Sequence, residues 1–388
     1  MKILINASNL SAGGGIQVAN SLILSLKKRK ENQYAVALSP QLKKTLPPLG
    51  SFPDNFIFSE KTDRNYSPLR VLSGRCGSLD DFLKETGSEI VFTVFGPAYW
   101  TPCGVPHLCG YALPFYIYPD SPALADIGFL NRLKFHFNRF LRMRAFSINC
   151  RAAVAETEDV AARLKKMLPE HRIYTVSNTY NQVFDDPAAQ DELELPHFDG
   201  VTLLTVSAAY RHKNLGLIVK TAEWLKKNSP DFRFRFVLTA EPEELGFGRG
   251  NIPAEILFIG RVNVASCPSL YRQSDFMFLP TMLECFSASY PEAFRMEKPV
   301  LTSDLPFARG LCGDAAEYFN PLSAEDSGKL ILRVSADETR KKELAEKGRR
   351  RLSLFLSAEQ RADRYLEILG RELRIFNECV NKNGVCKP

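Results

Sequence analysis

The chain of 388 residues lacks several features that would assign it to a class of protein at once. No stretch approaches the roughly 20 apolar residues of a membrane-spanning helix. Residues 1–10 hold only a short apolar run before polar residues begin, whereas a signal peptide requires a longer one. The sequence therefore predicts a cytoplasmic protein.

Cysteine is present but lacks the spacing of a metal site. The nine cysteines form an odd number, and none belongs to a Cys-x-x-Cys pair. This pattern excludes a zinc motif and a complete disulfide framework. A strong charge of one sign is also absent, since 50 basic and 44 acidic residues leave a net charge of +6. We therefore expect no nucleic-acid partner.

What the sequence does contain is a repeated alternation of strand and helix patterns. Buried strands are expected at 2–6, 89–95, 105–113, 152–156 and 172–178, and helices at 16–28 and 157–168. After a polar, acidic linker at 180–200, strands are expected at 201–209, 232–240, 255–260, 275–280 and 298–303, and helices at 214–227 and over most of 324–368. This order favours an α/β fold with two doubly wound parallel sheets, which bind ligands beyond the carboxyl ends of their strands.

Residues 131–151 form a basic segment without any acidic residue. Leu133, Phe137 and Phe140 follow a helical spacing, so we expect a helix with a mixed apolar and basic surface. One interpretation is an ordinary surface helix with snorkelling arginines. The other is a helix attracted to the headgroups of an anionic membrane.

The first candidate site is the glycine-rich loop at residues 11–20, SAGGGIQVAN, between a strand and a helix. Its glycines permit a tight turn and close approach of a ligand, and the helix start favours an anion. No Gly-Lys-Ser/Thr follows, so the loop is not a P-loop, and Val18 replaces the third glycine of a dinucleotide fingerprint. The alternative is a turn without a ligand.

The second candidate site is basic and lies just before a predicted helix. Arg211, His212 and Lys213 follow the strand at 201–209. Cations beside a helix N-terminus suit a diphosphate. A solvated basic loop is the alternative.

The third candidate site is the segment PTMLECFSASYPEAF at residues 280–294, which contains Glu284 and Glu292. Two carboxylates at the end of a strand accept hydrogen bonds from sugar hydroxyls or act as an acid/base pair. Ser289 and Glu292 also have the spacing of a capping box, so Glu292 has a purely structural alternative. No Asp-x-Asp or His/Asp cluster lies nearby, which argues against a metal site.

The order of these segments resembles the GT-B glycosyltransferases of the retaining family 4, or group 1, type. The resemblance rests on the glycine-rich first loop, the His-Lys-Asn before a helix, the two glutamates with seven residues between them, and KPVLTSDLP at 298–306. AETEDVAARLKKMLPEHRIYTVSN at 155–178 and most of 256–321, including GDAAEYFNP, are also similar to that family.

The resemblance implies two Rossmann-like domains that face a cleft. Residues 1–190 would form the acceptor-side domain and residues 191–360 the donor domain, and residues 361–388 would return to the first domain as a helix. No cofactor and no metal is expected, because Lys, Arg and helix starts stabilise the leaving diphosphate.

The resemblance also assigns roles to residues of the three candidate sites. Glu284 would contact hydroxyls of the donor sugar as the residue nearest to catalysis, and Glu292 would accept hydrogen bonds from the ribose. Lys213, with Arg211 in support, would compensate the diphosphate. The backbone N–H groups near Phe286 and Ser287 would bind phosphate. Gly14 and Gly15 would let the first loop approach the same phosphate.

The chain also departs from the family pattern. Ala208 stands where the family usually has an arginine, and Cys285 and Ser287 stand where it usually has glycines. His107 lies three residues before the place of the family's acceptor-side histidine, near Gly110, so we assign it a minor role and expect it to begin a strand. These departures concern the pose of the donor.

We therefore predict a retaining hexosyltransferase that moves a sugar from a nucleotide-diphosphate sugar to a hydroxyl of an acceptor glycan. The expected acceptor is a lipid-linked saccharide of a bacterial surface polysaccharide such as O-antigen, capsule or exopolysaccharide. Residues 131–151 would hold the protein peripherally on the inner face of the plasma membrane. The alternatives are an NAD-dependent oxidoreductase that uses the first loop, a non-catalytic nucleotide-sugar binding protein, and a relative that epimerises or hydrolyses the nucleotide sugar.

Overall fold

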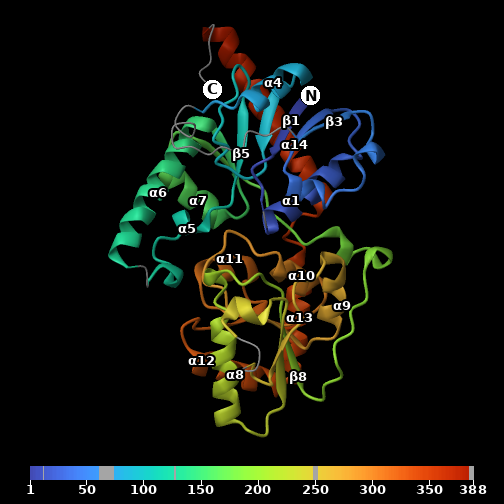
Figure 1. Cartoon of the computed structure of the whole chain (residues 1–388), viewed down its shortest axis with the longest axis vertical. Coiled ribbons are helices and arrows are strands. Elements are labelled where there is room, and N and C mark those ends of the chain that lie inside the picture. The colour runs from blue at the N-terminus through green and yellow to red at the C-terminus, as the bar shows by residue number, and fades with distance from the viewer. Residues whose placement is uncertain (12, 61–73, 126–127, 248–251, 384–388) are drawn as a thin grey trace. The chain divides into compact units, whose positions relative to one another are not determined.

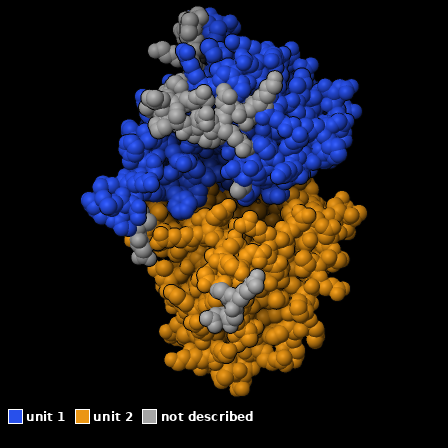
Figure 2. Space-filling model, in the orientation of Figure 1, with its two compact units in different colours: residues 1–117, 126–178, 356–388 blue, residues 118–125, 179–355 orange. Residues whose placement is uncertain are grey.

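The chain is divided into two compact units. The computed structural model describes residues 1–11, 13–60, 74–125, 128–247 and 252–383. Unit 1 comprises 1–117, 126–178 and 356–388, and unit 2 comprises 118–125 and 179–355 (Figures 1 and 2). The chain therefore passes from unit 1 to unit 2 after Asn178 and returns to unit 1 after Phe355. The predicted domain boundaries lie after residues 190 and 360.

Unit 1 is built on a parallel sheet of seven strands in the order β3-β2-β1-β4-β5-β6-β7. The strands are β1 (Lys2–Ala7), β2 (Gln33–Leu38), β3 (Phe56–Ser59), β4 (Ile90–Thr93), β5 (His107–Tyr111), β6 (Ala152–Ala155) and β7 (Arg172–Thr175). The helices are α1 (Gly14–Leu26), α2 (Pro40–Lys43), α4 (Gly77–Thr86), α5 (Pro114–Ile117), α6 (Phe129–Asn149), α7 (Glu158–Met167) and α14 (Ala358–Asn383). The inner strands are apolar and buried, as expected for a sheet covered on both faces.

The long helix α14 returns to unit 1, as the predicted fold class required. It packs beside α1 (Figure 1), and Arg29 Nε, shortly after the end of α1, donates to Asp363 Oδ1 over 2.8 Å. Tyr365 and Ile368 of α14 are buried in the same apolar core as the strands. The helix is therefore an integral layer of unit 1.

His107 begins β5, as predicted, and is 5% exposed. Its Nε2 is 2.8 Å from Thr93 Oγ1, and its Nδ1 is 2.8 Å from the backbone oxygen of Asn149. Burial lowers the pKa of His107 to about 4, so the ring is neutral near pH 7. These contacts give His107 a structural role inside the sheet.

Unit 2 contains a parallel sheet of six strands in the order β10-β9-β8-β11-β12-β13. The strands are β8 (Val201–Thr205), β9 (Phe234–Leu238), β10 (Ile256–Phe258), β11 (Phe276–Leu279), β12 (Val300–Ser303) and β13 (Ala316–Phe319). The helices are α8 (Gly216–Asn228), α9 (Cys267–Arg272), α10 (Ser289–Arg295), α11 (Pro306–Cys312), α12 (Ala324–Ser335) and α13 (Glu338–Leu352). The fold class is confirmed as α/β with two parallel, Rossmann-like sheets.

Aromatic side chains fix the centre of unit 2. Phe278 of β11 stacks on Phe319 of β13 with ring centroids 4.9 Å apart, and Phe236 of β9 meets Phe278 edge-on at 5.3 Å. Fully burying such a side chain contributes about 1.5–3 kcal/mol. This core holds the strand ends that carry the candidate site.

The strand order of unit 2 contains a topological switch point. From β8 the chain proceeds to β9 and β10 on one side, and then returns to β11 on the other side of β8. Leu203 of β8 pairs with Phe276 of β11. Open α/β sheets bind ligands beyond the carboxyl ends of the strands at such a point.

Candidate active site

The loops that follow β8 and β11 meet at the switch point of unit 2. Met282 N donates to the backbone oxygen of His212 over 2.8 Å, and Thr281 Oγ1 lies 3.3 Å from the same oxygen. Asn214 Nδ2 donates to the backbone oxygens of Pro280 at 3.2 Å and Pro321 at 2.8 Å. These bonds connect the basic segment and the glutamate segment, which the sequence separates.

Lys213 and Glu284, both predicted site residues, are in direct contact. Lys213 Nζ forms an ion pair with Glu284 Oε1, and Thr281 Oγ1 donates to the same oxygen over 3.1 Å. The side chain of Lys213 is 17% exposed and that of Glu284 is 9% exposed. Since little water screens the two charges, their attraction is stronger than that of a surface pair.

Arg211 and His212 complete the basic turn, a 3₁₀ helix over Arg211–Lys213. Arg211 is exposed and has no ion-pair partner among the residues that the structure describes. The ring of His212 stacks on that of Tyr210 with centroids 5.8 Å apart. Burial lowers the pKa of His212, so at neutral pH this ring adds little positive charge.

Glu292 lies in α10 and has different surroundings from Glu284. Its side chain is buried, and Tyr271 Oη donates to Glu292 Oε2 over 3.2 Å. Within the described ranges no Lys, Arg or His forms an ion pair with it. Burial raises the pKa of Glu292 to about 7, although the bond from Tyr271 opposes this shift.

The capping-box interpretation of Glu292 is wrong. The residue before the helix is Ala288, and no side chain caps its N-terminus. Ser289 lies inside the first turn, where its Oγ donates to the backbone oxygen of Val206 over 3.3 Å. The carboxylate of Glu292 points to Tyr271 instead of its own helix start, so the local spacing did not decide its role.

Phe286 and Ser287 lie in the loop between the two glutamates. The ring of Phe286 meets that of Phe355 edge-on, with centroids 5.9 Å apart. Within the described part of the chain, neither backbone N–H group donates to a protein acceptor. Neither group is therefore committed to a protein acceptor there, and their contact with phosphate stays a prediction.

Gly14 and Gly15 open α1 in unit 1. The preceding Gly13 has a φ of 70°, a left-handed conformation that glycine adopts without strain. A Cβ atom at Gly14 would meet open space, and one at Gly15 would touch Leu10 and Phe95 at 3.4 Å. The structure places both glycines at a helix start, and their approach to a donor stays a prediction.

Three residues of this site were not identified from the sequence as contributors. Asn214 has a φ of 55° and joins two loops through its amide, Thr281 binds Glu284, and Tyr271 binds Glu292. The one available signal in the sequence was an asparagine directly after the basic segment, because asparagine tolerates the left-handed conformation of a turn. Tyr271 gave none, because its partner is 21 positions away.

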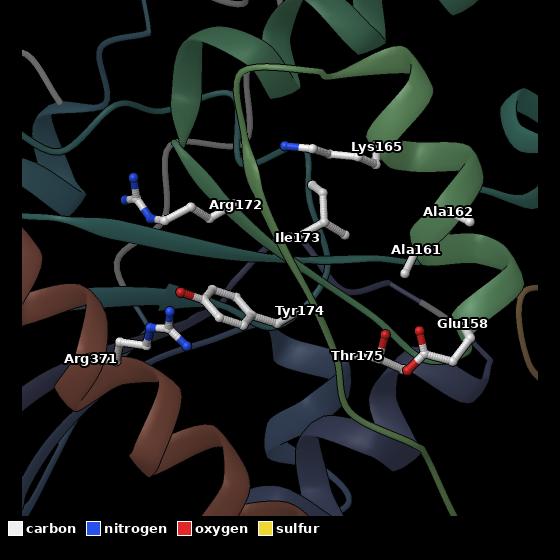
Figure 3. A pocket seen from close by; sticks show the side chains of 9 residues that line it. All are labelled: Glu158, Ala161, Ala162, Lys165, Arg172, Ile173, Tyr174, Thr175 and Arg371. Atoms are coloured by element: carbon white, nitrogen blue, oxygen red, sulfur yellow. The ribbon is translucent and has the colours of Figure 1, made fainter.

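A separate pocket of about 570 Å³ lies in unit 1 at the edge strand β7, between α7 and α14 (Figure 3). Its lining residues are Glu158, Ala161, Ala162, Lys165, Arg172, Ile173, Tyr174, Thr175 and Arg371. Arg172 Nε and Tyr174 Oη already bind Glu372 Oε1, at 2.8 and 2.6 Å. None of the predicted site residues lines this pocket.

The described residues show neither a metal cluster nor a membrane-spanning helix. No three His, Cys, Asp or Glu side chains gather closely enough there to bind a metal ion. None of the helices described there combines the length and apolar character needed to cross a membrane.

The sequence of unit 2 matches a known family. Residues 196–351 match the family model described as "Glycosyl transferases group 1". These residues form a glycosyl transferases group 1 domain. The match includes Lys213, Glu284 and Glu292, so the resemblance to the group 1 type is confirmed. No curated protein matches the sequence of the chain.

Solved structures extend the likeness from the group 1 domain to almost the whole chain. A glycosyltransferase from Rickettsia africae ESF-5 is 17% identical, with a TM-score of 0.69 over 96% of this chain and 98% of that one. Sucrose-phosphate synthase from Thermosynechococcus elongatus is 14% identical, with a TM-score of 0.68 over 95% and 98%. An Anabaena protein solved with UDP and glucose is 12% identical, with a TM-score of 0.63 over 95% and 99%. At these identities the likeness establishes the GT-B fold.

Proposed function

We propose that the protein is a retaining glycosyltransferase that transfers a hexose from a nucleotide-diphosphate sugar to a hydroxyl of an acceptor glycan. The contact between Lys213 and Glu284 carries this proposal. A cation suits the diphosphate, and an adjacent carboxylate suits the hydroxyls of the sugar. In a nucleotide sugar these two groups are covalently joined, so a donor site needs both receptors side by side.

The remaining residues extend the donor site around this pair. Arg211 and the free N–H groups of Phe286 and Ser287 would add positive potential around the diphosphate, and Glu292 would accept a hydrogen bond from the ribose. The resemblance adds Gly14 and Gly15 to the proposed donor-binding residues, and a Cβ atom at Gly14 would meet no atom within 4 Å. No metal or cofactor is part of the proposal, because protein cations and N–H groups supply the charge that a leaving diphosphate requires.

The proposed reaction replaces one bond at the anomeric carbon by another. The bond from this carbon to the diphosphate oxygen breaks, and a bond to the acceptor oxygen forms on the same face of the sugar. The proton of the acceptor hydroxyl passes to an oxygen of the leaving diphosphate. The enzyme's part is to position both substrates and to stabilise the charge that develops on the diphosphate.

A binding experiment tests the donor site first. Thermal unfolding is measured with UDP, GDP, ADP, their sugars and NAD, for the wild-type protein and for Glu292→Ala. A ligand at 100 times its Kd stabilises the folded state by about 2.7 kcal/mol. We begin with UDP, because the Anabaena structure contains UDP and glucose. Stabilisation by one nucleotide family, reduced in Glu292→Ala, supports the proposal, and stabilisation by NAD alone contradicts it.

We further propose that the acceptor is lipid-linked, in bacterial surface polysaccharide synthesis, and that helix α6 holds the protein on an anionic membrane. Five large apolar side chains of α6 are 53–79% exposed: Phe129, Leu130, Leu133, Phe137 and Phe140. At 3.6 residues per turn they fall on one face of the helix, opposite the buried Phe146 and Asn149. A water-exposed apolar stripe of this size is typical of a binding surface.

The charges of α6 indicate which partner fits the stripe. The helix contains four arginines, one lysine and no acidic residue. None of these cations forms an ion pair with a carboxylate in the described ranges. Apolar side chains flanked by unpaired cations complement an anionic bilayer, whose acyl boundary accepts the rings and whose headgroups attract the charges.

Vesicle sedimentation tests the membrane contact. We expect the protein to bind phosphatidylcholine vesicles that contain anionic phosphatidylglycerol, and to bind less at high salt. The variant Phe137→Ser/Phe140→Ser should bind several-fold more weakly. Ile57→Ser is the control, because Ile57 is a large apolar residue exposed at 55%, against 62% and 65% for the two phenylalanines, but lies in β3. Equal binding by both variants, or no binding by the wild type, contradicts the proposal.

A further inference from the structure

Tyr271 donates a hydrogen bond to one of the two carboxylate oxygens of Glu292. The tyrosine is fully buried in α9, and its hydroxyl lies 3.2 Å from Glu292 Oε2 and 3.4 Å from the backbone oxygen of Ser289. In the part of the chain that the structure describes, Glu292 Oε1 receives no hydrogen bond, and it is not among the fully buried, unpaired polar atoms. Oε2 is therefore held by the protein, whereas Oε1 has no protein donor among the described residues and belongs to a side chain whose residue is 8% exposed.

The position of Tyr271 depends in turn on the segment where the chain enters unit 2. Phe184 lies in a short 3₁₀ helix, Gln182–Phe184, and is 3% exposed. Its ring meets that of Tyr271 edge-on, with centroids 5.9 Å apart and planes at 62°. Edge-to-face pairs of buried rings have a preferred geometry, so Phe184 restricts how the ring of Tyr271 can tilt.

The rest of the linker forms hydrogen bonds with helix α9 and with the 3₁₀ turn Val264–Ser266 before it. Asp191 N donates to the backbone oxygen of Ala265 over 2.9 Å, and Leu193 N donates to Ser269 Oγ over 3.2 Å. Arg272 Nη2 donates to Glu192 Oε1 over 2.5 Å. The linker thus lies against α9, and Tyr271 of α9 contacts Glu292.

We propose that Tyr271 is a positioning residue that holds Glu292 Oε2 so that Oε1 meets a hydroxyl of the nucleotide ribose, and that the linker, through Phe184, fixes Tyr271 for this task. The inference rests on the proposed function, because it assigns a nucleotide to Glu292. It makes the interdomain linker part of the donor site. A linker that only tethered two units would need none of these contacts.

The test compares two buried tyrosines of unit 2. Tyr271→Phe keeps the ring against Phe184 and removes the hydroxyl that reaches Glu292. Tyr290→Phe is the matched control: Tyr290 is equally buried, and its hydroxyl binds Thr302 Oγ1 at 2.9 Å. Calorimetric titration of the full chain with UDP, GDP and ADP gives the affinity, and thermal unfolding reports on folding. We expect the Kd to rise about tenfold in Tyr271→Phe and to stay unchanged in Tyr290→Phe.

The pH profile separates positioning from a merely structural role. The groups that face Glu292 from α9 are Tyr271 and Cys267, while Arg295 on its own helix binds Asp185. Ionised Glu292 is the better acceptor, so affinity should rise with pH around the pKa of about 7. Loss of the tyrosine hydroxyl removes a bond that favours the carboxylate, so the midpoint should move to higher pH in Tyr271→Phe alone.

Each outcome decides between the inference and the function on which it rests. If the wild type binds none of the three diphosphates, the proposed function fails and the inference with it. If the wild type binds one and both variants match it, or both lose affinity equally, the inference alone is overturned. Phe184→Leu gives a second test that leaves the hydroxyl in place. A weaker Kd and a shifted midpoint support the role of the linker, and unchanged values overturn it.

Discussion

The two glutamates of residues 280–294 occupy opposite electrostatic surroundings in the same unit. Glu284 lies in the loop after β11 and is ion-paired with Lys213. Glu292 lies in α10 and is buried, and among the described residues it has no cationic partner and accepts a side-chain hydrogen bond from the hydroxyl of Tyr271 alone. Glu284 therefore belongs to a charged cluster, whereas Glu292 is held near its titration midpoint at neutral pH. The difference shows that residue type and spacing indicate where a carboxylate lies in the fold. Its partners from other elements determine whether it is ion-paired or titrates near neutral pH.

The largest expected change in the free energy of unfolding comes from removing Lys213, the cation that pairs with Glu284. Lys213→Ala leaves Glu284 with little access to water and without its partner, which costs about 3 kcal/mol of the free energy of unfolding. Urea unfolding at pH 7 measures this value. The control is the double variant Lys213→Ala/Glu284→Ala, which should regain part of the loss. If the two single losses simply add in the double variant, the pair does not interact as described.

Removing the charge of Glu292 should raise the free energy of unfolding at high pH, whereas Lys213→Ala should lower it. The folded-state pKa of Glu292 lies near 7, above its ordinary 4.5, so the folded state binds this proton more tightly than the unfolded state. The stability of the wild type should therefore fall as pH rises from about 5 to about 7. Glu292→Gln lacks this loss and should be more stable than the wild type by about 2 kcal/mol at pH 8. Urea unfolding at pH 5 and pH 8 provides the test, and a difference that does not depend on pH would contradict the explanation.

The smallest effect is expected for a second, more exposed ion pair in unit 2. Arg295 of α10 binds Asp185 of the linker over 2.6 Å, but the side chains are 41% and 51% exposed. Solvent screening should limit the loss in Arg295→Ala to about 0.5 kcal/mol, and 1 M salt should remove it. Urea unfolding with and without salt checks this value. A loss as large as that of Lys213→Ala would mean that burial is not what separates the two pairs.

Much of the fold could be predicted because its signals are local. Strands such as β1, β6 and β8 are short apolar runs, and helices such as α7 and α8 follow with their own periodicity. The expected helix at 131–151 is confirmed as α6, Phe129–Asn149. The strands β3 and β13 were not predicted. β3 is partly exposed at the edge of its sheet, and β13 is also an edge strand, so both carry a weak apolar pattern.

The candidate site was predictable in part. The basic turn and the two glutamates could be found because each follows a strand, and parallel strands end at one edge of the sheet. The capping box at Ser289 was a wrong alternative, since that motif also depends only on spacing. Tyr271 and Asn214 escaped notice because their roles depend on partners in other loops.

The sequence by itself determined the fold class and the residue types that gather at the ends of the unit 2 strands, because periodicity and turn chemistry act over a few neighbouring residues. Only the tertiary structure decided which groups touch. Lys213 meets Glu284 across 71 positions, and the linker reaches α9 across about 80 positions. It also decided that the apolar stripe of α6 faces water instead of a core. Such contacts depend on how whole elements pack, and packing is a property of the assembled sheet and its helices.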